Sequence, residues 1–338
     1  EVFCKDSSLN SDGQQTPPHL EIRNADKAWI IISAATSWFE GTDHDAAALE
    51  RVNNAVRDIE VALKKGRNAK ASKLMDKMHE KSILAYQDLY NRAGISIGSE
   101  STNPSNAGQS SAAPTTTDQR IVNYAAGCKD NALVSLYYNY GRYLLISSTR
   151  PGSLPPNLQG LWANSFNTPW NGDYHTNINV QMNHWIAEPG NLSELHEPLI
   201  GLVERLIHSG YKTAKDFYGP QAEGWVLHMM TNIWNYTAPG EHPSWGATNT
   251  GGAWLCDHLW EHFAYTGDME YLARVYPALK GASQFFLSTM IREPKNGYLV
   301  TAPSSSPENT FYEDGKAVSI CMGPTMDNQL VRELFLNT

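Results

Sequence analysis

The sequence predicts a mainly helical fold whose chemistry lies on the loops. Apolar residues recur at intervals of three and four from residue 45 onward, and short helical segments then follow one another along most of the chain. The loops between these segments are unequal in length, and one of them is long, polar and aromatic. Helices in succession with such loops are typical of an architecture built from paired helices.

The first residues are the exception to this helical pattern. Residues 1–27 read as loop, and residues 28–34 form a short β-branched run that predicts a buried strand. A lone strand is not stable without ladder partners. We therefore interpret it as the last piece of a β-domain.

The helices can be placed from their apolar stripes and end signals. The first begins near Asp45, ends at Gly66 and carries the stripe Leu49, Val52, Val56, Ile59 and Leu63. A second is expected over 70–91, and residues 99–119 are rich in Ser, Thr and Pro, which predicts a flexible loop. Asp130 is positioned to cap a third. Later helices are expected over 198–210 (Pro198 in its first turn, Gly210 at its end), 211–218, 252–265, 268–276 and 277–291.

Composition narrows the classes of partner. Twenty-six Lys and Arg against 35 Asp and Glu give a net charge of -9, which disfavours nucleic acid and anionic membranes. No apolar run approaches the roughly 18 residues that a membrane span needs, and the first residues do not resemble a signal peptide. The sequons at Asn191 and Asn235 favour a secreted or extracellular protein. The pairing state of the scattered cysteines (Cys4, Cys128, Cys256 and Cys321) is left open.

Tryptophans gather with uncharged polar residues in the middle of the chain. Eight of the ten lie between Trp162 and Trp260, and residues 154–197 add eight Asn, three His and one Tyr. A Trp face suits the C–H face of a sugar ring, and amides, imidazoles and carboxylates suit its hydroxyls. Any one Trp is more simply explained as a packing residue, but the combination favours a carbohydrate site.

Several long segments resemble glycoside hydrolase family 95, and they occur in the family's order. They are GRYLLISSTRPGSLPPNLQGLWA (141–163), HTNINVQMNHW (175–185), NLSELHEPL (191–199), GGAWLCDHLWEHF (251–263) and TAPSSSPEN (301–309). The resemblance runs from about residue 28 to residue 338 and implies an inverting α-L-fucosidase without metal or organic cofactor. Its substrate is then a fucosylated glycan, with terminal α-L-fucose, most simply α-1,2-linked.

The family architecture implied is an (α/α)6 barrel preceded by a large β-domain. We accordingly expect residues 1–40 to end the β-domain, 41–98 to form a helical linker, 99–120 a flexible loop and 121–338 an incomplete barrel.

The resemblance also assigns catalytic roles. Glu308 in SPEN matches the general acid, and its apolar or neutral neighbours favour a protonated carboxyl. Asn177 and Asn179 match paired asparagines that position the attacking water, and both side chains can point the same way if the segment is extended. The aspartate that serves as base in the family lies downstream of residue 338. Asp327 is a possible substitute, but its place at the start of a predicted helix favours N-capping.

For substrate contacts the resemblance implies His175, Glu241 and Trp254. His at the position of His175 accompanies fucose in the family, whereas Thr accompanies L-galactose, so an α-L-galactosidase is an alternative. A second alternative is a fragment that binds fucosylated glycans without cleaving them.

A competing motif lies within the family segment at residues 258–262. His258, Glu261 and His262 form an H-x-x-E-H pattern, which on a helix puts both His on one face and is found in zinc peptidases. Because the pattern is short and lies inside WLCDHLWEHF, we favour barrel packing for these residues. A zinc peptidase would need both imidazoles and a third protein ligand on one metal.

Overall fold

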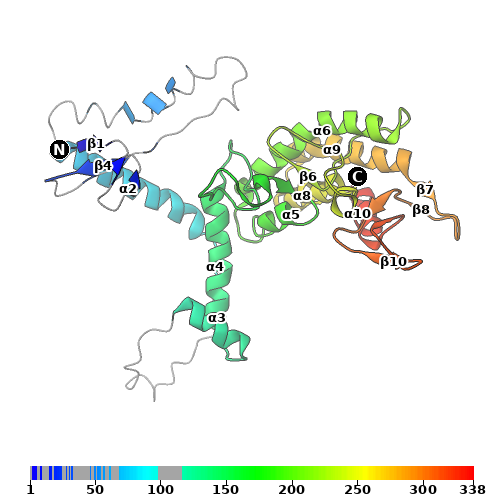
Figure 1. Ribbon diagram of the computed structural model, residues 1–338, viewed down its shortest axis with the longest axis horizontal. Coiled ribbons are helices and arrows are strands. Elements are labelled where there is room, and N and C mark those ends of the chain that lie inside the picture. Colours follow the sequence, from blue (N-terminus) through cyan, green and yellow to red (C-terminus); the bar gives the residue numbers. More distant parts are fainter. Residues whose placement is uncertain are drawn as a thin grey trace. The chain divides into compact units, whose positions relative to one another are not determined.

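The computed structural model describes residues 68–97 and 116–338 without interruption (Figure 1). Before residue 68 it describes residues 2–5, 8–9, 15–16, 19–24, 28, 30, 32, 46, 49–50, 52–54, 56–57 and 61. The chain forms two compact units, residues 1–84 and 85–338. The candidate site lies entirely in the second.

The first unit contains two small antiparallel ladders. Strand β1 (Val2–Lys5) pairs with β4 (His19–Ile22), and β2 (Ser8–Leu9) pairs with β3 (Gln15–Thr16). The expectation of loop over residues 1–27 is therefore wrong at these positions. In the β1–β4 register Val2 lies opposite Ile22 and Cys4 opposite Leu20.

The predicted strand at 28–34 is described only at residues 28, 30 and 32. None of these three belongs to a strand, and Ile30 and Ile32 are exposed; the other positions lie outside the described residues. The described residues from 46 to 61 are all helical, as the apolar stripe predicts, although Ile59 and Leu63 lie outside them. Helix α2 (Asn68–Tyr90) confirms the helix expected over 70–91.

Helices α3 (Thr117–Ala125) and α4 (Asn131–Ser148) begin the fully described part of the second unit. Most of the predicted loop 99–120 lies outside the described residues. The predicted cap is confirmed: Asp130 Oδ1 accepts the backbone N–H of Leu133 at 2.8 Å. The same carboxylate binds the Arg120 guanidinium at 2.8 Å, which joins the two helices at their adjacent ends.

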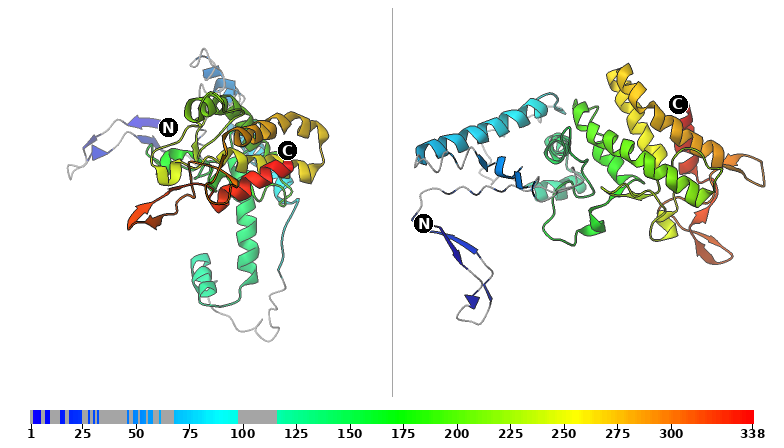
Figure 2. Two further views of the ribbon diagram at one scale, coloured as in Figure 1. Left: turned by 90° about the vertical axis from the view of Figure 1, so that its right-hand side faces the viewer. Right: turned by 90° about the horizontal axis from the view of Figure 1, so that it is seen from above.

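The second unit is mainly helical, and its helices from residue 197 onward include four that pack side by side (Figures 1 and 2). Helix α8 (Gly251–Thr266) contacts α6 (Glu197–Tyr218), α9 (Met269–Thr289) and α10 (Thr325–Asn337). The short elements between them are η2 (Pro169–Gly172), α5 (Asn179–His184), η3 (Ser193–Leu195) and α7 (Pro243–Gly246). Two-stranded ladders join β5 (Tyr174–His175) to β6 (Met230–Thr231), β7 (Ile291–Arg292) to β8 (Leu299–Val300), β9 (Ser304–Ser305) to β12 (Ile320–Cys321), and β10 (Phe311–Glu313) to β11 (Lys316–Val318).

Two expected helix breaks do not occur. Gly210 lies inside α6, where an added Cβ would sit 2.9 Å from the carbonyl oxygen of Val226 and 3.0 Å from the Trp225 side chain. This glycine therefore permits close packing and does not end the helix. Pro277 lies inside α9, whose buried residues on both sides of the proline continue the helix through it.

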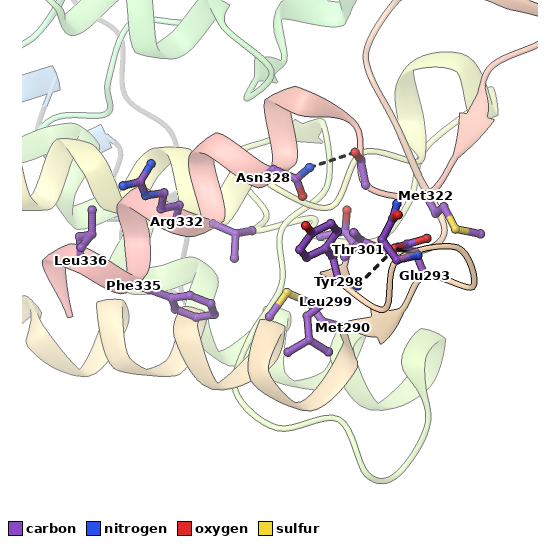
Figure 3. Close-up of a pocket in the computed structure, with 14 residues that line it drawn as sticks. Met290, Glu293, Tyr298, Leu299, Thr301, Met322, Asn328, Arg332, Phe335 and Leu336 are labelled. Atoms are coloured by element: carbon purple, nitrogen blue, oxygen red, sulfur yellow. Dashed lines mark hydrogen bonds between the residues drawn. The ribbon is translucent and has the colours of Figure 1, made fainter.

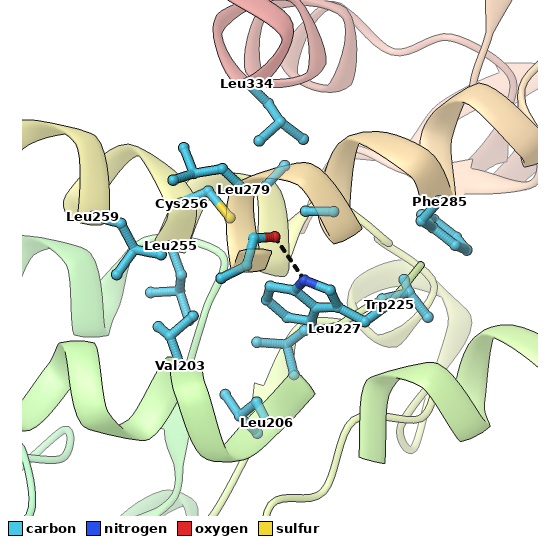
Figure 4. Packing of buried hydrophobic residues seen from close by; sticks show 14 of the residues in the cluster. Val203, Leu206, Trp225, Leu227, Leu255, Cys256, Leu259, Leu279, Phe285 and Leu334 are labelled. Carbon is cyan, nitrogen blue, oxygen red and sulfur yellow. Dashed lines mark hydrogen bonds between the residues drawn. The ribbon is translucent and has the colours of Figure 1, made fainter. Parts of the chain in front are cut away.

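One apolar core holds these helices together (Figure 4). The Trp225 ring is fully buried among side chains of the surrounding helices, and its Nε1–H donates to the carbonyl of Ala278 at 2.9 Å. A buried indole satisfied in this way contributes apolar area without a desolvated donor. A second, smaller core contains Leu89, Leu145, Ile146, Ala187, Leu192 and Leu195.

The structure reports the state of three of the cysteines and bears on membrane spans. Cys128, Cys256 and Cys321 carry free thiols, and Cys256 is fully buried. Among the described helices, none combines the length and apolar character that crossing a bilayer requires.

Candidate functional site

Three of the predicted site residues converge on one cavity. His175, Glu241 and Glu308 line a hollow of about 310 Å³, although they are far apart in sequence. The other lining residues are Trp170, Asn171, Asp173, Met229, Met230 and Trp245. Carboxylates, an imidazole and tryptophan rings around a hollow of this size match the groups and space that one sugar ring requires.

The β5–β6 ladder brings the first part of the cavity together. His175 lies opposite Met230 in the antiparallel register, and the next residue, Thr176, makes two hydrogen bonds to the segment just before β6. Its N–H donates to Met229 O at 2.7 Å and its buried hydroxyl donates to His228 O at 2.7 Å. These bonds hold the backbone next to His175 in place.

The cavity gathers three carboxyl groups around one imidazole. Burial lowers the pKa of His175, while the nearby carboxylates of Asp173, Glu241 and Glu308 oppose that shift. Burial also raises the pKa of Asp173, and His175 opposes it. Glu308 itself is exposed, so the apolar and neutral residues beside it in the sequence do not enclose its carboxyl.

The paired asparagines, Asn177 and Asn179, follow His175 closely in the sequence, but neither lines the cavity. Asn179 is the first residue of α5, so residues 177–179 are not the extended segment we considered. The Oδ1 atom of Asn177 is buried and makes no hydrogen bond with the described residues. A buried acceptor without a donor is costly, and a bound water or ligand hydroxyl would satisfy it.

The structure does not bring Trp254 to the same place. Trp254 lines a separate hollow of about 310 Å³, together with Trp185, Asp257 and Glu261. Its place one turn into α8 directs it to this other hollow, away from His175 and Glu241.

Asp327 is not the helix cap that its position suggested. The N-cap of α10 is Pro324, and the Asp327 side chain is fully buried. Its Oδ2 accepts the Thr301 hydroxyl at 2.6 Å, and its Oδ1 accepts the Thr250 hydroxyl at 3.4 Å. Burial raises the pKa of Asp327, and these hydroxyls oppose the shift. The carboxyl therefore joins the start of α8 to the segment that leads to Glu308.

A buried histidine–glutamate cluster went unrecognised in the sequence. Glu188 Oε1 accepts from His196 Nδ1 at 2.8 Å and from His262 Nδ1 at 2.6 Å, and Ser193 donates to Oε2. His196 Nε2 lies 2.8 Å from His258 Nδ1. Burial opposes ionisation, but the hydrogen bonds from His196, His262 and Ser193 lower the pKa of Glu188 to about 2. The only sequence signal was the spacing of His258 and His262 on one helix face.

This cluster bears on the zinc-peptidase pattern. Glu188, His196 and His262 have ligand atoms within 4.8 Å of one another, as a metal site needs, but His258 is not in that set. The two histidines of the pattern are instead bonded to different partners, His196 and Glu188. The two histidines of the H-x-x-E-H pattern therefore take part in a packed polar network, while Glu261 is exposed; this is not the arrangement expected of that peptidase motif.

A larger hollow, with a mainly apolar lining, lies elsewhere in the second unit. It has a volume of about 760 Å³ and lies between the end of α9, the β7–β8 hairpin and α10 (Figure 3). Its one carboxylate, Glu293, accepts backbone N–H groups of its own turn, from Lys295 and Asn296. With no second carboxylate among its lining residues, this hollow does not match a glycosidase site.

Comparison with known proteins agrees with the cavity chemistry. The profile of the glycosyl hydrolase family 95 catalytic domain matches residues 74–338, which include every candidate site residue. The chain belongs to glycosyl hydrolase family 95.

Curated relatives in family 95 are named as fucosidases. The chain is 37% identical over 321 residues to the Arabidopsis thaliana protein "Alpha-L-fucosidase 2", an alignment covering 94% of this chain and 36% of that protein. It is 44% identical over 211 residues to "Probable alpha-fucosidase A" of Aspergillus niger, covering 61% of this chain and 26% of that protein. The chain thus spans about a third or less of the length of these family 95 relatives.

Proposed function

We propose that this chain carries the sugar-binding and acid-bearing part of an inverting α-L-fucosidase. The observation that supports this most directly is the convergence of His175, Glu241 and Glu308 on one cavity of monosaccharide size, within a family 95 domain. In this proposal α6, α8, α9 and α10 belong to the (α/α)6 barrel of the family.

The proposed reaction is a single displacement at the anomeric carbon. Glu308 donates its proton to the glycosidic oxygen as the C1–O bond breaks, while a water attacks C1 from the opposite face. Asn177 and Asn179 hold that water, and the unsatisfied Oδ1 of Asn177 is available to accept a hydrogen bond from it. An amide is too weak a base to take the proton, so the water's proton passes to a carboxylate.

His175 and Glu241 are the proposed contacts to the sugar. Burial favours the neutral imidazole of His175, which can both donate to and accept from sugar hydroxyls. The substrate we propose is a glycan with terminal α-1,2-linked L-fucose, which is uncharged at the scissile unit. Asn191, the acceptor residue of one sequon, is exposed, which supports the proposal of a secreted or extracellular protein.

Hydrolysis of 2′-fucosyllactose, followed by proton NMR, tests this function. An inverting enzyme releases β-L-fucose first, and Glu308→Gln stops the release. Glu313→Gln is the matched control, because Glu313 is an exposed glutamate on the neighbouring β10 and does not line the cavity.

The outcomes separate the proposal from its alternatives. Cleavage of only the corresponding L-galactoside would reassign the sugar, and binding of 2′-fucosyllactose without any cleavage would indicate a glycan-binding protein. First release of the α-anomer would contradict the single displacement.

A further inference from the structure

Three buried side chains from separate segments point ligand atoms at one another. They are Glu188, between α5 and η3, His196, directly before α6, and His262, on α8. Glu188 Oε1 lies 2.8 Å from His196 Nδ1 and 2.6 Å from His262 Nδ1. Among the described residues, this is the one group of three or more such side chains whose ligand atoms all lie within 4.8 Å of one another. None of the three lines the cavity that holds Glu308.

Two imidazoles and one carboxylate form a donor set that zinc prefers. Zinc sites use His nitrogens at about 2.0–2.1 Å and carboxylate oxygens at about 2.0–2.2 Å, and a water completes the tetrahedron where the protein supplies three ligands. Ligand atoms around one tetrahedral zinc are about 3.3 Å apart. The two separations from Glu188 Oε1 therefore have to grow by only about 0.5–0.7 Å for an ion to replace the hydrogens between these atoms.

The outer nitrogen of each ring also has a neighbour suited to a zinc ligand. A neutral histidine that binds zinc through Nδ1 carries its proton on Nε2, and an acceptor usually holds that proton. His196 Nε2 lies 2.8 Å from His258 Nδ1, which can accept it. His262 Nε2 lies 3.9 Å from Glu197 Oε1, so a carboxylate faces this ring as well.

The segment that carries the first two ligands is held in place by its neighbours. Leu192 and Leu195 are fully buried in the smaller core and fix the chain between Glu188 and His196. The Ser193 hydroxyl donates to Glu188 Oε2, which leaves Oε1 to face the two imidazoles. Ligands that are already positioned in this way lose little freedom when an ion binds.

An adjoining hollow gives space beside the cluster. Glu188 and His196 are among the residues that line the hollow of about 310 Å³ to which Trp254 belongs. Asp257 and Glu261 add two more carboxyls to its wall, and none of its described lining residues is Lys or Arg. A wall with acidic groups and no basic ones attracts cations. The hollow also has room for a water as fourth ligand.

We propose that Glu188, His196 and His262 bind one Zn²⁺, with a water as the fourth ligand, and that the ion joins α8 to the segment between α5 and α6. The role of this ion is structural. No residue of the proposed hydrolysis belongs to the site, so the inference does not rest on the proposed function. His262 is then a ligand, and His258 is a positioning residue that holds the His196 ring.

Zinc binding by the 338-residue chain tests the proposal. The chain is treated with EDTA, freed of the chelator and titrated with ZnCl₂ in a calorimeter. We expect one Zn²⁺ per chain, a Kd below about 1 µM and a higher Tm in the presence of zinc. His262→Gln removes a ligand and should weaken binding at least about 100-fold, whereas His258→Gln removes only the outer partner of His196 and should weaken it about tenfold.

His208→Gln is the matched control, because His208 is exposed and does not belong to the cluster. It should leave the affinity for zinc unchanged, and far-UV circular dichroism checks that each variant is folded. Co²⁺ in place of Zn²⁺ gives a readout that needs no variant, since a four-coordinate site produces intense visible absorption and a six-coordinate one does not. Weak Co²⁺ bands, no zinc binding by the parent chain, or equal affinity of the parent and the His262→Gln chain would overturn the inference. The cluster would then be a hydrogen-bonded network alone, and the proposed function would stand.

Discussion

Arg142 lies at the centre of the smaller core and offers the sharpest test of how the second unit is held together. Its guanidinium is completely buried and donates to four backbone carbonyls: Tyr90 and Ala93 at 2.6 Å, Leu89 at 3.0 Å and Gly190 at 3.3 Å. Three of these carbonyls lie at or just beyond the C-terminal end of α2, where helix carbonyls lack intrahelical donors and favour a cation. No other side chain could supply this fork of donors.

The loss of stability on removing the Arg142 guanidinium follows from these four hydrogen bonds. Leaving each carbonyl without a donor costs about 1 kcal/mol or more, which gives about 4 kcal/mol for the four. Removing the buried charge also removes its desolvation penalty, which offsets part of this cost. The surrounding apolar residues keep water out, so water does not replace the lost donors. We therefore expect Arg142→Met to lower the free energy of unfolding by about 3–5 kcal/mol, the range seen when a buried charge network is broken. Arg142→Lys should recover only part of this.

Urea denaturation followed by far-UV circular dichroism measures the effect. Arg292→Met is the control, because Arg292 is exposed and donates to a single carbonyl, that of Gly297. Its loss should cost less than about 1 kcal/mol. An Arg142→Met protein within about 1 kcal/mol of the parent would refute the reasoning, since it would mean that the four carbonyls find other donors.

Three further substitutions follow from the buried charges and caps. Burial, followed by the charges of Glu333 and Glu261, raises the pKa of Asp257 to about 7. The folded state therefore loses stability as the pH rises from about 4 to above 7. In urea denaturation, Asp257→Asn should raise the free energy of unfolding by about 2–4 kcal/mol at pH 8 and leave it unchanged at pH 4. The pH dependence from Glu188 has the opposite sign, because its lowered pKa of about 2 stabilises the fold above about pH 4.5 and this stability is lost as the pH falls. Glu188→Gln should therefore lower the free energy of unfolding by about 2–3 kcal/mol at pH 7, and the difference should shrink in thermal melts below pH 4. Asp130→Ala removes the α4 cap and should cost about 1–2 kcal/mol in thermal melts, whereas a change below about 0.3 kcal/mol would contradict the capping role.

The sequence predicted most of the helices because their signals are local. The cap at Asp130 and the span of α8 depend on neighbours within a turn, and both were confirmed. The predicted breaks at Gly210 and Pro277 were wrong because tertiary packing decides there: Gly210 meets the Val226 carbonyl, and Pro277 lies in a helix buried on both sides. The short ladder of β1 and β4 was missed because it joins residues about 14 to 20 positions apart, and strands of four residues carry little periodicity of their own.

The site shows the same division between local and distant information. Family motifs placed His175, Glu241 and Glu308 in one cavity, which neither periodicity nor composition could have done. Trp254 was assigned to that cavity as well, but the direction of its side chain depends on the packing of α8. The bond between Glu188 and His262 crosses 74 residues, so the spacing of residues along the chain carries no signal for it.

The role of Glu308 is the centre of this account, and two substrates test it most directly. A general acid is needed when the leaving group is a sugar hydroxyl, as in 2′-fucosyllactose, and is not needed for α-L-fucosyl fluoride, whose fluoride leaves without a proton. We predict that Glu308→Gln lowers kcat/KM for 2′-fucosyllactose by at least about 100-fold and for the fluoride by less than about tenfold. Equal losses on both substrates would contradict the assignment, because they would show that Glu308 acts in binding or folding and not as the proton donor.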